Sequence, residues 1–470
     1  MERLSALDAT FLYFETAEQH QHVCAVMVVD PSTVPGGYHY EKIKEHIASR
    51  LHLLAPFRRK LMMVPLGLDH PVWVETKDFD LDYHVRRVGL PSPGTEEQLA
   101  ELAADISSRQ LDRSKPLWEM WIVEGLENGH VALIGKMHHS TVDGVSGANM
   151  MVHLLDLEPG GTRPPPDADW QPERAPSELE LFARGILQRL RRPVQLAMVI
   201  PKTIGSVIGF VRARRAGTAG MPTPFTAPRT PFNVSITPHR VVAFTRTPLE
   251  DIKLVKRAFG TTVNDVVLAV AAGALRRYLE GLNELPSKSL MAVVPVSVRS
   301  DEEKDVPGSN KVSAMFTSLA TDIDDPVERL HRIQAVNKGA KEEHKAIGAG
   351  MLQDWAKFAA PTTFSLAARL YSALNLAERF APVHNLVISN VPGPPFPLYF
   401  GGAKLVAMYP LGPVFHGAAL NMTVVSYQDI VCWGMIAGRE SMPGIWDLAA
   451  AIPEALAELL KAADAVINED

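Results

Sequence analysis

The chain is poor in cysteine and has no long hydrophobic run. Among its 470 residues only Cys24 and Cys432 carry thiols, which is too few for a disulfide framework and favours a reducing cytoplasm. No apolar stretch of about 18 residues passes without a charge or a proline, so a membrane-spanning helix is not expected. Glu2 and Asp8 stand where a secretory signal would be basic or apolar. We therefore expect a cytoplasmic protein, and any contact that it makes with a membrane should be peripheral.

The composition is that of an ordinary globular protein with unevenly distributed charge. It is 46% hydrophobic and 21% charged, and the length allows two domains with sizeable cores. The formal net charge is −6, yet eleven basic residues and no acidic one lie between Glu180 and Glu250. A proline-rich stretch precedes this basic region. We predict a first domain over 1–160, a linker with a basic amphipathic segment over 161–230, and a second domain over 231–470.

The alternation of apolar and polar residues predicts strands and helices in both halves. The predicted strands cover 23–29, 72–75, 117–124, 131–137, 290–298, 386–389, 404–408, 418–426 and 430–436, and the predicted helices cover 40–53, 96–110, 148–155, 262–282, 326–345, 355–377 and 445–465. A short turn joins 117–124 to 131–137, so these two strands should be antiparallel neighbours in a mixed sheet.

The stretch VALIGKMHHSTVDGVSGANMM, residues 131–151, carries the clearest chemical pattern. His138 and His139 end a predicted buried strand, and Asp143 and Gly144 lie in the polar turn that follows. Side chains alternate along a strand, so one histidine can enter a cavity as a base while the other forms a wall. The residues alone do not choose between the two, and Asp143 could orient an imidazole or pair with a distant arginine. HHxxxDG at a strand end favours catalysis over a structurally satisfied histidine pair.

Other polar groups have simpler interpretations. His20, His22 and Cys24 alternate as a metal site on a strand would, but no second ligand pair accompanies them, so we predict a structural strand and no metal. Thr262 and Asp265 resemble a capping pair at the start of a long helix, which is the favoured role of Asp265.

The basic segment 181–216 has two interpretations that the sequence leaves open. Phe182, Ile186 and Leu190 line one helical face with arginines beside them, as in helices that lie on anionic membranes. The same segment could instead pack on the second domain. No nucleic-acid-binding motif accompanies the charge, so nucleic acid is not an expected partner.

HHSTVDG, residues 138–144, resembles the active-site signature of the bacterial wax ester synthase/acyl-CoA:diacylglycerol acyltransferase family, within the HHxxxDG acyltransferase superfamily. Further blocks resemble that family in the expected order and together cover nearly the whole chain. They are LSALDATFLYFET near the start, PLWEMWIVEGL, TVNDVVLAV, PVSVRS and SNVPGP. One departure is Gly308-Ser309-Asn310, where the family commonly has Gly directly followed by Asn.

The resemblance implies a fold and a set of site residues. It implies an α+β protein with two chloramphenicol acetyltransferase-like domains, each a mixed sheet with flanking helices, and an active-site channel between them. His139 would be the general base, His138 and Gly144 would shape the pocket, and Asp143 would be structural, with Arg299 as its candidate partner. The matching blocks make Asn264, Asp265, Asn390, Pro392 and Gly393 candidates for channel or substrate contacts. SNVPGP could equally be a plain turn.

The resemblance also implies the reaction. We expect transfer of a long-chain acyl group from acyl-CoA to diacylglycerol, and to fatty alcohols as a second activity. One histidine would remove the hydroxyl proton, with no covalent acyl-enzyme. Acyl-CoA would be a co-substrate, and no cofactor is expected. The alternatives are a condensation-type enzyme with a carrier-protein-bound donor, and a non-catalytic lipid-binding paralogue.

Overall fold

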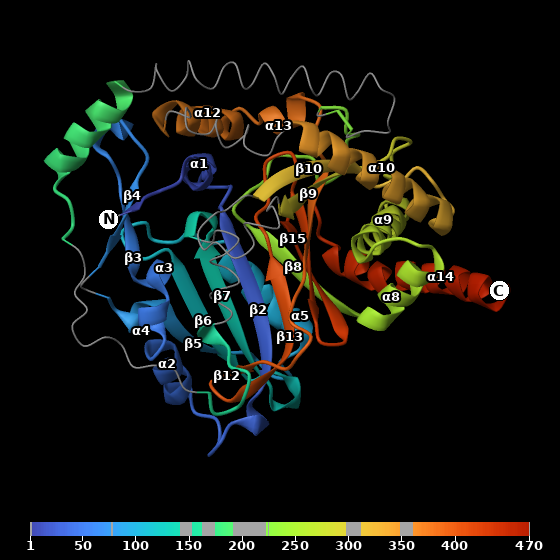
Figure 1. The fold of residues 1–470 in the computed structure, drawn as a ribbon, viewed down its shortest axis with the longest axis horizontal. Helices are drawn as coiled ribbons and strands as arrows, with labels where there is room; N and C mark the ends of the chain where they lie inside the picture. The colour runs from blue at the N-terminus through green and yellow to red at the C-terminus, as the bar shows by residue number, and fades with distance from the viewer. Residues whose placement is uncertain are drawn as a thin grey trace.

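The computed structural model describes most of the chain. It covers residues 2–76, 79–141, 153–161, 174–190, 222–223, 225–297, 312–347 and 361–469. Figure 1 shows two large sheets side by side, with helices on their outer faces. The first sheet is built mainly from the N-terminal half, and the second comes entirely from the C-terminal half.

The first sheet has six strands in the order β12-β13-β2-β7-β6-β5. Their bounds are β2 (His22–Asp30), β5 (Val85–Gly89), β6 (Trp118–Glu124), β7 (Val131–His138), β12 (Tyr399–Phe400) and β13 (Ala403–Leu411). β5 and β6 are parallel and the other pairs are antiparallel, so the sheet is mixed. The antiparallel pairing predicted for β6 and β7 is confirmed. Two of the strands, β12 and β13, come from the C-terminal half of the chain.

The second sheet also has six strands, in the order β10-β9-β11-β14-β15-β8. Their bounds are β8 (Arg240–Pro248), β9 (Met291–Ser297), β10 (Val312–Ser318), β11 (Leu386–Val391), β14 (Leu420–Tyr427) and β15 (Ile430–Gly438). β11 runs parallel to both β9 and β14, while the remaining pairs are antiparallel. A mixed sheet in each half agrees with the predicted fold class.

A small third sheet of order β1-β4-β3 flanks the first. Its strands are β1 (Glu2–Arg3), β3 (Arg59–Met62) and β4 (Val72–Glu75). The consecutive basic residues Arg58, Arg59 and Lys60 lie at and just before the start of β3. Arg59 and Lys60 pair with β4, and the Arg58 side chain is only 14% exposed and lies 3.9 Å from Glu75.

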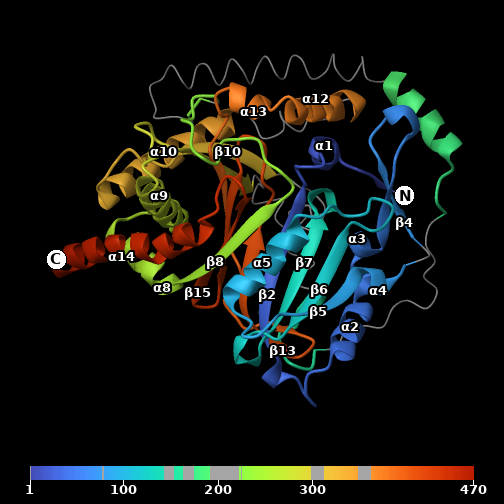
Figure 2. The same ribbon diagram turned by 180° about the vertical axis from the view of Figure 1, so that it is seen from behind.

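Helices cover the outer faces of the sheets (Figures 1 and 2). Their bounds are α1 (Ala6–Phe14), α2 (Tyr40–Ala48), α3 (Ala55–Arg58), α4 (Leu81–His84), α5 (Glu96–Ser107), α8 (Leu249–Ala258), α9 (Val263–Gly281), α10 (Pro326–Ile347), α12 (Pro361–Ala373), α13 (Leu376–Arg379) and α14 (Ile445–Glu469). Reciprocal side-chain bonds between Thr262 and Asp265 open α9, as their spacing predicted. Of the described residues, no single helix is long and apolar enough to cross a membrane; the bent pair α8 and α9 passes by length and composition only.

The two large sheets meet where β13 lies against β14 and β15. Gly434 of β15 has no side chain at this junction, and a Cβ placed there would lie 2.0 Å from the Pro410 carbonyl oxygen on β13. Glycine is therefore required at Gly434 because the two backbones approach too closely for any side chain.

Gly434→Ala tests this contact between the sheets. The added methyl group must push the Pro410 backbone away, so we expect a loss of about 1–3 kcal/mol or more in the free energy of unfolding, measured with urea. Gly89→Ala on β5 is the matched control, because a Cβ there meets nothing within 4 Å. Equal stability of the two variants would contradict the tight junction.

Candidate active site

The two adjacent histidines lie at the end of β7, and their rings have different neighbours. His138 is the last residue of β7 and stands opposite His22 of β2. His139 begins a short 3₁₀ turn over His139–Thr141, and its backbone N–H donates to the Gln21 carbonyl at 2.7 Å. This bond extends the β2–β7 ladder by one residue pair. Because side chains alternate along the ladder, His22 and His138 share one face and His139 lies on the other.

His138 is a buried wall residue with a defined tautomer. Its side chain is 1% exposed, and its Nδ1 accepts the Ser140 backbone N–H at 3.1 Å. Burial lowers the pKa of His138, although the nearby Glu15 carboxylate acts in the opposite direction. A neutral ring that accepts at Nδ1 carries its proton on Nε2, and Nε2 lies 3.5 Å from Glu15 Oε2.

Glu15, directly after α1, is the charged centre on the His138 side. Its carboxylate receives two hydrogen bonds from the Arg113 guanidinium, at 3.1 and 2.5 Å, and its Oε1 lies 3.4 Å from His22 Nε2. Burial alone would raise the pKa of Glu15, but the two histidines and Arg113 together hold it well below its usual range. Burial lowers the pKa of His22 to about 3. The cluster therefore consists of one ion pair and two neutral imidazoles.

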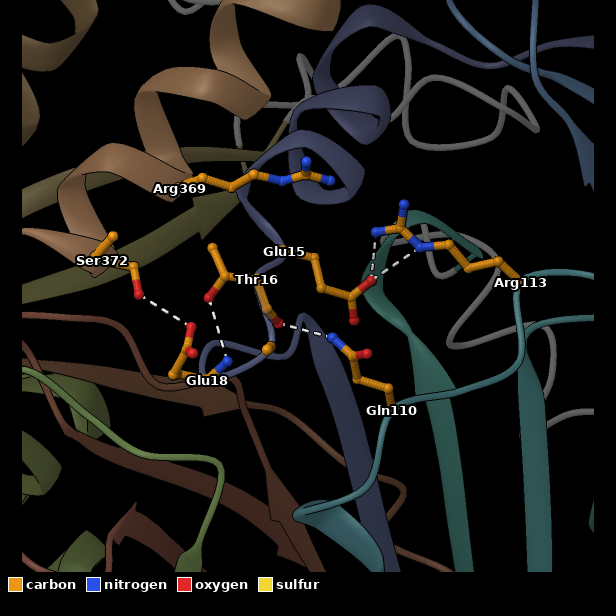
Figure 3. Close-up of a pocket in the computed structure, with 9 residues that line it drawn as sticks. Glu15, Thr16, Glu18, Gln110, Arg113, Arg369 and Ser372 are labelled. Atoms are coloured by element: carbon orange, nitrogen blue, oxygen red, sulfur yellow. Dashed lines mark hydrogen bonds and ion pairs between the residues drawn. The ribbon is translucent and has the colours of Figure 1, made fainter.

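A polar cavity of about 540 Å³ opens beside this cluster (Figure 3). Its lining comes from the α1–β2 connection, the segment after α5, and α12. The lining residues are Glu15, Thr16, Ala17, Glu18, Gln110, Arg113, Arg369, Ser372 and Ala373. Figure 3 shows the Arg113 guanidinium directed at Glu15, while Ser372 of α12 donates to Glu18 at 3.0 Å. The cavity thus lies between the two halves of the chain.

The surroundings of His139 favour an unprotonated imidazole. Its ring stacks on Phe11 of α1, with centroids 3.9 Å apart and planes 18° from parallel. Its Nδ1 is buried and has no hydrogen-bond partner in the described ranges of the chain. Burial lowers the pKa of His139 to about 4, with a smaller opposing effect from its own backbone. The imidazole is therefore neutral at physiological pH and can accept a proton.

The half-buried His139, whose imidazole is neutral because its pKa is lowered, makes stability depend on pH. Its pKa lies below the usual value of 6.5 in the folded chain, so the unfolded chain binds more protons between pH 6.5 and pH 4. Its contribution is fully present above pH 6.5 and is lost as the pH falls toward 4. From pH 7 to pH 5 we expect the parent to lose about 2 kcal/mol more than His139→Leu, by urea unfolding. The replacement of the exposed His239 by leucine is the control. An equal loss in the parent and in His139→Leu would contradict the lowered pKa of His139.

The other predicted site residues lie in the second half of the chain. Asn264 at the start of α9 and Asn390 on β11 are brought together, with Asn390 Nδ2 donating to Asn264 Oδ1 at 3.4 Å. Asp265 is engaged by Thr262 and by Asn337, whose Nδ2 donates to it at 2.8 Å. Among the described residues, neither asparagine shares a hydrogen bond with the histidines.

The SNVPGP bend packs against the backbone of β14 at Ser426. A Cβ at Gly393 would lie 2.0 Å from the Ser426 carbonyl oxygen, and the Gly393 N–H donates to Ser426 Oγ at 3.1 Å. The close backbone approach therefore involves β14. Pro392, next to it, is exposed. Asp143, Gly144 and Arg299 lie outside the described residues, so the Asp143–Arg299 pair stays a prediction.

Several residues of this site were not singled out in the sequence. Phe11 and Glu15 belong to the LSALDATFLYFET block, while Gln21 and Arg113 lie in no quoted block. The sequence reveals the block, but it does not reveal that Glu15 pairs with Arg113, because the two residues are 98 positions apart.

No group of histidine, cysteine or acidic side chains in the described part of the chain could hold a metal ion. Cys24 Sγ instead lies 3.3 Å from Ser107 Oγ.

Comparisons with known proteins agree along nearly the whole chain. Residues 4–267 match the model of the wax ester synthase/diacylglycerol acyltransferase catalytic domain, and residues 308–460 match the WS/DGAT C-terminal domain. A Mycobacterium tuberculosis protein provisionally named diacylglycerol O-acyltransferase is 42% identical over 99% of this chain and 91% of its own length.

Solved structures show the same fold. The wax ester synthase/diacylglycerol acyltransferase from Marinobacter aquaeolei VT8 aligns with a TM-score of 0.69 at 32% identity, covering 99% of this chain and 100% of its own. The first condensation domain of the CDA synthetase aligns with a TM-score of 0.56 at 13% identity, covering 98% of this chain and 96% of its own. At that identity the second likeness concerns the fold alone.

Proposed function

The chain belongs to the wax ester synthase/diacylglycerol acyltransferase family, and on that premise we propose that it transfers a long-chain acyl group from acyl-CoA to diacylglycerol, with fatty alcohols as a second acceptor. Family membership supports an acyl-CoA-dependent acyltransferase. The observation that carries the mechanism is the His139 ring, which stacks on Phe11 and whose Nδ1 has no hydrogen-bond partner among the described residues, with burial lowering its pKa.

The reaction requires one proton carrier. His139 removes the proton of the acceptor hydroxyl as its oxygen attacks the thioester carbonyl, so the C–O bond forms while the proton moves to the imidazole. The tetrahedral intermediate then expels the CoA thiolate, the C–S bond breaks, and His139 returns the proton to sulfur. The acyl group passes directly between substrates, and no serine or cysteine nucleophile takes part. A positioned base of this kind contributes roughly 10²–10⁴ in rate.

His139→Ala tests this assignment. With a long-chain acyl-CoA and either diacylglycerol or hexadecanol, we expect the parent to release free CoA and form ester, and the variant to lose about two or more orders of magnitude in kcat. His239→Ala, at an exposed position, is the control. Retention of full activity by His139→Ala would exclude His139 as the base.

We also propose that the segment 181–216 makes peripheral contact with a membrane or lipid droplet. Residues 191–216 lie outside the described part, but residues 178–190 form a helix with Leu181 buried against the small sheet. Ile186, Leu187 and Leu190 of this helix are 42%, 50% and 71% exposed, with Arg184 and Arg189 nearby in sequence. Exposed apolar side chains beside arginines suit an anionic lipid surface.

Replacing Ile186, Leu187 and Leu190 together by serine tests this contact. The burial of three apolar side chains in the lipid would be lost, so we expect binding to phosphatidylserine-containing vesicles to weaken by at least about tenfold in a sedimentation assay. Leu282→Ser, which removes an exposed leucine at the end of α9, should bind as the parent does. Unchanged binding by the triple variant would contradict the proposal.

A further inference from the structure

Gln21 is a buried amide without a hydrogen-bond partner among the residues that the structure describes. Gln21 is 0% exposed, and neither its Nε2 nor its Oε1 makes a hydrogen bond within the described part of the chain. Buried amides are normally paired, because leaving a buried donor and acceptor unsatisfied destabilises a protein. Because Gln21 lies next to the proposed base, a polar group of a bound substrate could supply the missing hydrogen bond.

The β2–β7 ladder places Gln21 beside the proposed base. The Gln21 carbonyl accepts the His139 N–H at 2.7 Å, one position beyond the His22–His138 pair. Residues directly opposite each other in an antiparallel ladder direct their side chains to the same face, with Cβ atoms about 4.5–5.5 Å apart. The Gln21 amide therefore lies on the His139 face, away from Glu15, His22 and His138.

The residues next along this face are apolar. The pair beyond His22 and His138 consists of Val23 and Met137, both half-buried, and Phe11 stacks on the His139 ring. A simple fatty alcohol with its hydroxyl at His139 would present only methylene groups here and would leave the Gln21 amide unpaired. An acceptor with a polar group near its reacting hydroxyl would pair it.

We propose that Gln21 is a specificity-determining residue that selects diacylglycerol over a fatty alcohol. In diacylglycerol an ester group is attached to the carbon next to the one that bears the free hydroxyl. With that hydroxyl at His139, the ester carbonyl accepts a hydrogen bond from Gln21 Nε2. The inference rests on the proposed function and names the acceptor class that it favours. A site that hydrogen-bonds a substrate group discriminates strongly against analogues without that group.

The first experiment compares acceptors. For the parent protein, kcat/KM is measured with oleoyl-CoA and 1,2-dioleoylglycerol, its 1,2-dialkyl ether analogue, or hexadecanol. The ether analogue keeps the hydroxyl and both chains but lacks the carbonyl groups. We expect the ester to exceed the ether by at least about tenfold. Equal values for ester and ether would overturn the proposal, and this comparison does not depend on a variant that folds.

The second experiment uses Gln21→Met, which keeps an unbranched chain of similar length without the amide. We expect kcat/KM for dioleoylglycerol to fall by at least about tenfold, while the values for the ether and hexadecanol stay within about twofold. Gln334→Met is the matched control, because its amide bonds to the Gly260 carbonyl at 3.0 Å on the exposed side of α10. It should leave all three values unchanged.

The remaining outcomes separate the proposal from the function on which it rests. An equal loss for ester, ether and hexadecanol in Gln21→Met would assign the amide to the shared acyl donor and overturn acceptor selection. An unchanged ester-to-hexadecanol ratio would overturn it as well. Equal values for ester and ether in a parent protein that acylates both would refute the inference alone. A parent protein that acylates hexadecanol but not dioleoylglycerol would refute the inference and the proposed acceptor, and one that acylates no alcohol would refute the proposed acyl transfer as well.

Discussion

The site depends on the pairing of β2 with β7, which continues to the hydrogen bond at the end of β7. The bond from the His139 N–H to the Gln21 carbonyl fixes the register at the strand end. A slip of one residue would exchange the two faces, placing His138 where His139 now lies. The ladder thus assigns two chemically identical side chains to different environments. One contacts an ion pair, and the other lies beside Phe11 as a neutral base.

The connection between α1 and β2, residues 15–21, ties this register to the rest of the molecule. Glu15 pairs with Arg113 in the first half of the chain. From the second half, Arg240 donates to the Glu18 carbonyl at 2.6 Å and the His416 backbone N–H donates to the Gln19 side chain at 2.9 Å. Both halves therefore hold the segment that ends at Gln21. The position of His139 depends on the contact between halves, although no residue of the second half needs to touch its ring.

Sequence patterns predicted those strands and helix ends that depend on residues close together in the chain. The apolar run before His138 gave β7, and the spacing of Thr262 and Asp265 gave the start of α9, because both depend on neighbouring residues. The alternation rule also predicts different surroundings for the two histidines, and His138 lies near Glu15 while His139 stacks on Phe11. Glu15 and Gln21 could not be predicted as site residues from the sequence. Their contacts, with Arg113 and with His139, join residues far apart in the chain, and hydrophobic periodicity carries no information about such contacts. For the same reason β13, far along the chain, was predicted as a strand but not as a neighbour of β2.

Direct transfer of the acyl group with His139 as base can be tested by a rapid-quench experiment without acceptor. The protein is mixed with an equimolar amount of long-chain acyl-CoA, free CoA is followed over time, and the intact mass of the protein is measured. Direct transfer predicts no release of CoA in proportion to enzyme and no added acyl mass until an alcohol is supplied. A stoichiometric burst of CoA together with an acylated protein would contradict the claim.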